Sequence, residues 1–140
     1  MSQENVEKLR LHLQPWGEPG VLEAAGRGEG DWSLIDPEAT YEDDSLPDHA
    51  GEVYRGHEGL ARATRQMIEP FVGTTIELDR IVGSGDRLVS IHRIRAKSRI
   101  TGIDFDVPYA YVWTFRTGKI IHGRGFASTR KALEAVGVEE

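Results

Sequence analysis

Cysteine is absent from this sequence of 140 residues. Its absence excludes disulfide bonds, thiolate metal sites and a cysteine nucleophile. Long apolar runs are missing as well, because no stretch approaches the roughly 20 apolar residues that a membrane-spanning helix requires. The first ten residues, MSQENVEKLR, are polar from the start and predict no signal peptide. We therefore expect a cytoplasmic protein without a membrane partner.

The sequence also lacks an excess of positive charge. Its 17 lysines and arginines are outnumbered by 23 aspartates and glutamates, which gives a formal net charge of −6. A general nucleic-acid binder needs a basic face to meet phosphates, so nucleic acid is not an expected partner. The length suits one domain with one core, and we expect a single domain over residues 1–140.

The hydrophobic period changes from helical to alternating along the chain, which predicts an α+β fold. The expected main sheet is antiparallel, with four main strands and one short early strand. Three helices from the first half and a short C-terminal helix pack on it. The predicted helices are 2–16, 18–25, 57–71 and 129–136, and the predicted strands are 39–43, 74–82, 87–100, 103–116 and 119–127.

The strand over 105–115 alternates cleanly, and its aromatic side chains gather on one face. We expect this whole face to be covered, and its members are Phe105, Val107, Tyr109, Tyr111, Trp113 and Phe115. A two-residue turn at Thr101 and Gly102 would place three residues of the preceding strand opposite this face: His92 opposite Tyr111, Ser90 opposite Trp113 and Ile94 opposite Tyr109. Buried hydroxyl, imidazole and indole groups all need partners, so this mixture predicts an apolar pocket with a few polar groups. The alternative is a packed core that buries the same side chains for their mass.

The stretch DDSLPDHAGEVYRGHEG, residues 43–59, gathers five carboxylates and two histidines. Its spacing matches neither a zinc motif nor a calcium loop, so we predict no metal site. Most of its charges are expected at the rim of the pocket and at the start of a helix. Only Asp43 and Tyr54 are candidates to face inward, and for Asp43 the alternative is a turn-capping role.

Three further polar residues are expected away from the pocket. His12 is expected on the exposed face of the first helix. His122 and Arg124 are expected on the outer face of the last strand, where a partner subunit could cover them.

The order of these elements resembles the SnoaL-like branch of the nuclear transport factor 2-like superfamily. The resemblance spans nearly the whole chain and is carried by the segments SQENVEKLR, SLIDPEATYED, VYRGHEGLARA, VGSGDRLVSIHRIRA, TGIDFDVPYAYVWTFRTGKI and ALEAVGV. It implies a cone-shaped fold, in which helices close a curved sheet over a deep pocket. It also implies a homodimer that pairs through the outer face of the sheet.

Ketosteroid isomerase and the polyketide cyclases belong to the relatives that the resemblance implies. In the isomerase, the position of the catalytic base matches Asp43, and a second aspartate that donates a hydrogen bond matches Tyr111. Cyclase-type relatives carry a histidine and an aspartate on the last strand, where this chain has Gly123 and Gly125. This departure argues against the cyclase mechanism, and the two glycines are expected to leave room for a bulkier ligand.

We therefore predict a pocket for a small apolar or aromatic molecule, with cofactor-free proton transfer of the isomerase, dehydratase, cyclase or epoxide-hydrolase type. Asp43 is the predicted base, with Tyr111 and His92 as donors. The predicted ligand contacts are Tyr41, Tyr54, Ser90, Ile94, Tyr109, Trp113, Gly123 and Gly125. A non-catalytic binding module and a dimerisation scaffold stay open. A solvated Asp43 would favour the first alternative, and a fully packed aromatic set would favour the second.

Overall fold

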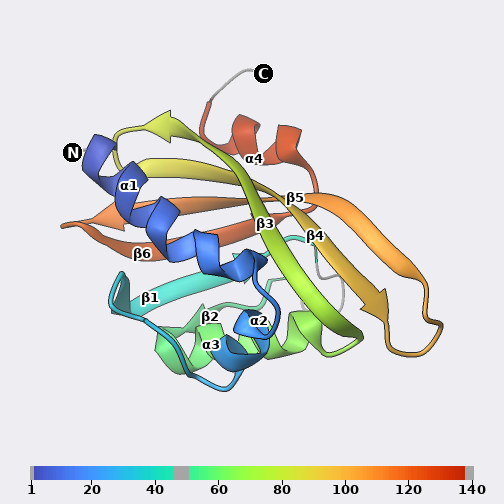
Figure 1. Cartoon of the computed structure of the whole chain (residues 1–140). Coiled ribbons are helices and arrows are strands. Elements are labelled where there is room, and N and C mark those ends of the chain that lie inside the picture. The colour runs from blue at the N-terminus through green and yellow to red at the C-terminus, as the bar shows by residue number, and fades with distance from the viewer. Residues whose placement is uncertain (1, 46–50, 138–140) are drawn as a thin grey trace.

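Six strands form one curved sheet in the order β2-β1-β6-β5-β4-β3 (Figure 1). The computed structural model describes residues 2–45 and 51–137, with the backbone alone for Ser2 and Ser84. Neighbouring strands are antiparallel, except that β1 runs parallel to β6. The strands are β1 (Ile35–Asp43), β2 (Tyr54–Arg55), β3 (Phe71–Ser84), β4 (Arg87–Ser98), β5 (Asp104–Arg116) and β6 (Lys119–Phe126). The α+β prediction is confirmed, with β2 as an additional strand too short to show a period.

Three helices lie on the inner face of the sheet and one lies on the outer face (Figure 1). The inner helices are α1 (Ser2–Leu13), α2 (Val21–Gly26) and α3 (Gly56–Ile68), and the outer helix is α4 (Thr129–Ala135). The first helix ends earlier than predicted, at Leu13, and continues as the 3₁₀ turn η1 (Gln14–Gly17). Pro15 explains this change, because a proline has no N–H for an α-helical hydrogen bond. None of the described helices is long and apolar enough to cross a membrane.

Apolar side chains are buried on both faces of β5. On the inner face, Tyr111 and Trp113 pack in one cluster with Leu9 and Leu13 of α1. On the outer face, a second cluster joins the sheet to α4, and its members are Val89, Ile91, Ala110, Val112, Phe126, Ala132 and Leu133. The apolar part of the outer face is therefore covered within this chain. Pairing of two copies through the outer face stays a prediction.

The register of β4 and β5 differs by two residues from the predicted one. Ser90 lies opposite Tyr111, and His92 lies opposite Tyr109. The turn between β4 and β5 is longer than the predicted two residues. The Ser98 N–H donates to the Ile103 carbonyl at 2.8 Å, so residues 99–102 form the loop. A shift of two keeps every side chain on its predicted face, since the side-chain period of a strand is two. His92 therefore faces inward, as predicted, although its strand partner is wrong.

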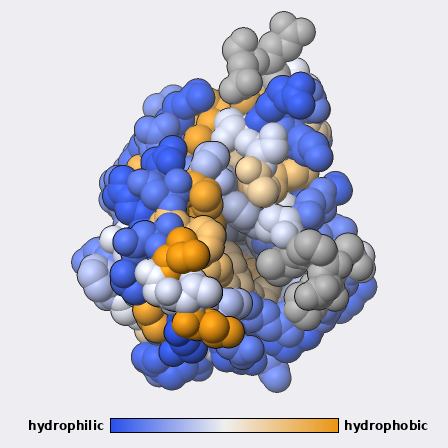
Figure 2. Space-filling view, turned by 90° about the vertical axis from the view of Figure 1, so that its right-hand side faces the viewer, coloured by the Kyte–Doolittle hydropathy of each residue, from blue (hydrophilic) through white to orange (hydrophobic). Residues whose placement is uncertain are grey.

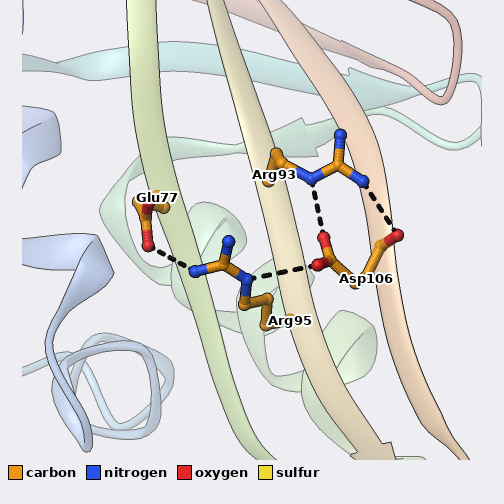
Figure 3. Close-up of polar contacts among 4 residues, drawn as sticks. All are labelled: Glu77, Arg93, Arg95 and Asp106. Atoms are coloured by element: carbon orange, nitrogen blue, oxygen red, sulfur yellow. Dashed lines mark hydrogen bonds and ion pairs between the residues drawn. The ribbon is translucent and has the colours of Figure 1, made fainter.

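Charged side chains cross the outer face of β3, β4 and β5 in this register (Figure 3). Asp106 accepts a hydrogen bond from Arg93 Nε at 2.7 Å, and Arg95 Nη1 lies 2.7 Å from Glu77 Oε2. Arg95 Nε also approaches Asp106 at 3.4 Å. The side chains are about half exposed, so the ion pairs add little stability. They give this part of the outer face a charged surface.

The end of the β4–β5 hairpin extends beyond the helices. Phe105 and Val107 belong to the aromatic face of β5 but are 40% and 42% exposed, and Ile103 is 58% exposed. Figure 2 looks onto this side of the molecule and shows an apolar band bordered by hydrophilic surface. The prediction that the whole face is covered is therefore wrong at this end, because the inner helices do not reach it.

We predict that Leu133→Ala, in α4, lowers the free energy of unfolding by about 2–5 kcal/mol, because it empties a packed site. Leu133 is 3% exposed and lies against the outer face of the sheet. Urea denaturation measures the loss. The matched control is Glu134→Ala on the exposed side of the same helix. Equal losses for the two variants would contradict the docking of α4.

Candidate functional site

A cavity of about 370 Å³ lies between the inner face of the sheet and the helices. Its wall is mainly apolar and aromatic, and it is formed by α1, η1, α2, α3 and the strands β1, β3 and β5. Among its lining residues are Leu11, His12, Trp16, Leu22, Glu29, Asp31, Trp32, Ile35, Tyr41, Asp43, Leu60, Thr64, Met67, Ile76, Tyr111 and Trp113. This volume and composition are typical of a small-molecule site.

Asp43 lies on the wall of this cavity at the end of β1 and is only 6% exposed. Its Oδ2 accepts the Tyr41 hydroxyl at 2.7 Å. Tyr109 Oη lies 2.5 Å from Oδ1 and 2.6 Å from Oδ2. Oδ1 also accepts the Ser45 N–H at 2.9 Å and the Ser45 hydroxyl at 2.5 Å. The buried carboxylate therefore has hydrogen-bond donors at both oxygens, as a buried charge requires.

The parallel pairing of β1 with β6 makes room for this carboxylate. Asp43 lies opposite Gly125, and Tyr41 lies opposite Gly123. A Cβ on Gly125 would stand 2.5 Å from Tyr41 Oη and 2.8 Å from Asp43 Oδ2, and a Cβ on Gly123 would meet the Trp113 ring at 2.7 Å. The two glycines do leave space, but side chains of this chain fill it. The expectation of space for a bulkier ligand there is wrong.

Three phenols surround the carboxylate and stay protonated. Burial raises the pKa of Tyr41, Tyr109 and Tyr111, and the Asp43 charge raises each pKa further. Tyr111 lines the cavity, and its hydroxyl points to Met67 Sδ at 3.9 Å. Thioether sulfur is a weak acceptor, so the Tyr111 O–H can be donated to a ligand oxygen instead.

His92 lies behind the cavity wall rather than in it. Its ring stands 5.4 Å from that of Tyr111 and 6.1 Å from that of Trp16. Its Nε2 is 2.7 Å from Ser90 Oγ, which also accepts the Trp113 indole N–H at 2.8 Å. Burial lowers the pKa of His92 to about 4. The imidazole is neutral near pH 7, and its geometry supports a positioning role for Trp113 rather than donation to a ligand.

His12 lines the cavity, so the prediction that it lies on an exposed face is wrong. It stands four residues before Trp16, and their ring centroids are 6.0 Å apart. Burial lowers the pKa of His12, although the charge of Asp31 acts in the opposite direction. The i, i+4 spacing to Trp16 places both rings on one side of the predicted helix 2–16, but it does not show that this side faces the cavity.

The structure brings four of the predicted site residues to the cavity: Tyr41, Asp43, Tyr111 and Trp113. Seven do not line it, and these are His92, Tyr54, Ser90, Ile94, Tyr109, Gly123 and Gly125. Tyr54 is fully buried and donates to Gln66 Oε1 at 2.5 Å, with Arg62 over its ring. Sequence reasoning missed the lining residues of the helices and of the loop before β1, above all His12, Trp16, Asp31 and Trp32.

The outer-face prediction for β6 holds in its geometry. His122 Nδ1 lies 2.7 Å from Thr40 Oγ1, and Arg124 pairs with Asp44 at 2.9 Å. Thr40 on β1 and Asp44 directly after it alternate along the chain with the inward residues Tyr41 and Asp43. Among the described residues, no three histidine, aspartate or glutamate side chains gather as metal ligands. Asp48 and His49 of the stretch 43–59 lie outside the described residues.

A family model for the SnoaL-like domain matches residues 23–123. The match covers more than half of the chain, and the chain therefore belongs to the SnoaL-like family. No curated protein sequence matches it significantly.

Solved structures show the same fold at low sequence identity. A protein from Catenulispora acidiphila with a ketosteroid isomerase-like fold, in complex with trimethylamine, has a TM-score of 0.67 at 16% identity, over 95% of this chain and 94% of that chain. A protein assigned as a SnoaL-like polyketide cyclase from Jannaschia sp. CCS1 has a TM-score of 0.68 at 18% identity, over 99% and 95%. TerC, co-crystallised with polyporic acid, has a TM-score of 0.69 at 19% identity, over 95% and 97%. These likenesses establish the nuclear transport factor 2-like cone.

We predict that His92 makes the protein less stable in acid. Its folded pKa of about 4 lies below the ordinary value of 6.5, so the unfolded chain binds this proton first as the pH falls. Stability from neutral His92 is complete above about pH 6.5 and is lost toward pH 4, with a total of about 3 kcal/mol. Urea unfolding between pH 4.5 and 7 should show a smaller pH slope in His92→Leu. An unchanged slope would contradict the lowered pKa.

We predict that Gly125→Ala lowers the free energy of unfolding by about 1–3 kcal/mol, because the new methyl group collides with Tyr41 and Asp43. Thermal or urea denaturation measures the change. The matched control is Gly17→Ala, whose Cβ would stand 3.8 Å from its nearest neighbour. A similar effect of both substitutions would show that the cluster around Asp43 is not tightly packed.

Proposed function

We propose that this SnoaL-like protein binds a small, largely apolar molecule with a ring in its cavity, and that Asp43 transfers a proton on this molecule. The observation that carries the proposal is one carboxylate, 6% exposed, on the wall of a mainly apolar cavity. A general base works best where water is excluded and where it is held in one orientation. Asp43 meets both conditions.

One oxygen of Asp43 keeps capacity for a substrate proton. Oδ1 accepts the Ser45 N–H and hydroxyl, whereas Oδ2 accepts Tyr41. Tyr109 has one proton and can donate it to only one of the two oxygens. The Ser45 hydroxyl also lies 2.6 Å from Tyr109 Oη and can donate to it. When Ser45 donates to Tyr109 and Tyr109 donates to Oδ1, Oδ1 accepts two hydrogen bonds and one lone pair of Oδ2 is free to accept a proton from carbon.

Tyr111 supplies the matching donor. Removing a proton beside a carbonyl group places negative charge on the carbonyl oxygen, and a preorganised O–H stabilises this charge. Burial and the Asp43 charge raise the pKa of Tyr111, although hydrogen bonding with Tyr41 acts in the opposite direction. The proton therefore stays on Tyr111, and the weak acceptor Met67 does not hold it. Asp43 and Tyr111 therefore form the pair for enolisation, the step shared by isomerisation, dehydration and aldol-type cyclisation. Proteins of the same fold were crystallised with trimethylamine and with polyporic acid, which supports a small-molecule role.

We expect Asp43→Asn to lower the rate of solvent-deuterium exchange into a cyclic enolisable ketone by 10²–10⁴-fold, because the general base is lost. Proton NMR of a ketone panel measures this exchange with the full chain. The matched control is Asp104→Asn, which makes the same chemical change at an exposed ion pair of the hairpin. Equal exchange in the wild type and in Asp43→Asn would exclude Asp43 as the base.

The second candidate is a binding protein without catalysis. The specific observation in its favour is the number of donors around Asp43, because these donors occupy lone pairs that a general base would offer to a substrate proton. On this alternative, Asp43 orients Tyr41 and Tyr109 beside the ligand. Ligands that raise the melting temperature without any exchange catalysis would identify the binding protein, since binding to the folded state alone stabilises it.

A further inference from the structure

The charges around the cavity have one sign. Three carboxylates line it, from Glu29, Asp31 and Asp43, while no lysine or arginine of the described chain does. The one basic side chain in the wall is His12, and burial lowers the pKa of His12 and favours its neutral form. An anionic ligand would meet repulsion and no cationic partner here.

The three carboxylates differ in how far neighbouring groups compensate their negative charge. Glu29 is already paired with Arg27 at 2.8 Å, so its charge is largely compensated. Asp31 is exposed near His12, and hydrogen bonds from Ser33 lower the pKa of Asp31 and keep it ionised. Asp43 is buried, and neutral groups supply its hydrogen bonds. Two uncompensated carboxylates therefore remain, one at the surface and one deep in the wall.

Aromatic rings complete the wall between these carboxylates. Five line the cavity, namely Trp16, Trp32, Tyr41, Tyr111 and Trp113. Trp32 is fixed by its indole N–H, which lies 3.1 Å from the carbonyl oxygens of Gly28 and Glu29. Trp16 stands edge-on to Tyr111, with ring centroids 5.7 Å apart. Aromatic faces attract cations, and the attraction grows when water is excluded.

We propose that the ligand class of this cavity is an organic cation, a tertiary or quaternary ammonium group with apolar substituents. The inference rests on the proposed function, because it assumes that the cavity holds a ligand. Alkyl groups on nitrogen spread the charge over an apolar surface, which suits aromatic walls. The buried Asp43 carboxylate supplies the counter-charge, and Asp31 attracts the cation toward the cavity. A neutral ligand of the same shape would gain neither contribution.

Choline and 3,3-dimethylbutan-1-ol test this proposal, because they have the same shape and differ in a central N⁺ against a neutral carbon. Isothermal titration calorimetry of the full chain at pH 7 should give a dissociation constant at least 10-fold lower for choline. The expected factor corresponds to a desolvated cation–aromatic contact. Benzyltrimethylammonium serves as a second cation with a ring.

Two variants locate the effect. Asp43→Asn should reduce the affinity for choline at least 5-fold more than it reduces the affinity for the neutral alcohol, and circular dichroism checks that the variant folds. Asp31→Asn removes an exposed charge without touching the buried cluster, and it should reduce choline affinity 2- to 5-fold. The matched control, Asp104→Asn, should change neither affinity.

Each remaining outcome overturns the proposal in a recognisable way. Equal binding of choline and its neutral isostere would exclude a cation site and leave the proposed function standing. Binding of neutral ketones without binding of either cation would likewise exclude the cation site and leave the proposed function standing. Failure of every cation and every neutral ligand to bind would remove both the cation site and the proposed ligand cavity.

Discussion

The structure of the site depends on one buried negative charge. A carboxylate that leaves water must be given hydrogen-bond donors, and Asp43 obtains them from Tyr41, Ser45 and Tyr109. These residues come from β1, from the residues that follow it and from β5. The parallel pairing of β1 with β6 places Gly125 beside these residues. A Cβ at position 125 would collide with Tyr41 and Asp43, so only glycine leaves enough space for the cluster. The charge thus fixes how the edge of the sheet is assembled.

The remainder of the cavity follows from what lies around this charge. Tyr111 and Trp113 line the cavity from β5. Ser90 accepts the indole N–H of Trp113 and so holds this ring in position. The helices add Trp16 and His12, whose imidazole is held largely uncharged by burial. The wall is mainly apolar and aromatic, with one buried carboxylate and no basic counter-ion in the described lining. The two proposals rest on this composition, and they give the same carboxylate the roles of a base and of a counter-charge to a cation.

Periodicity in the sequence was sufficient for the fold and for part of the site. The alternation over β5 predicted that Tyr111 and Trp113 face inward, and this survived a register error of two residues, because such an error conserves the face. Two features of the site could not be predicted from the sequence, namely the lining by His12 and the side chains that fill the space at Gly125. The lining by His12 depends on how α1 lies over the sheet, which the period of one helix does not determine. The space at Gly125 was foreseen, but its occupants come from the pairing of β1 with β6, which joins segments about 80 residues apart.

Both proposals require that Asp43 faces a space that a ligand can enter. A crystal structure of the full chain grown with benzyltrimethylammonium would show whether it does. We predict density for the cation inside the cavity, with its ammonium group beside the Asp43 carboxylate and its methyl groups against Tyr111 and Trp113. A cavity closed by the side chains of Trp16 and Met67, or an Asp43 carboxylate turned to solvent with the cation bound elsewhere, would contradict it.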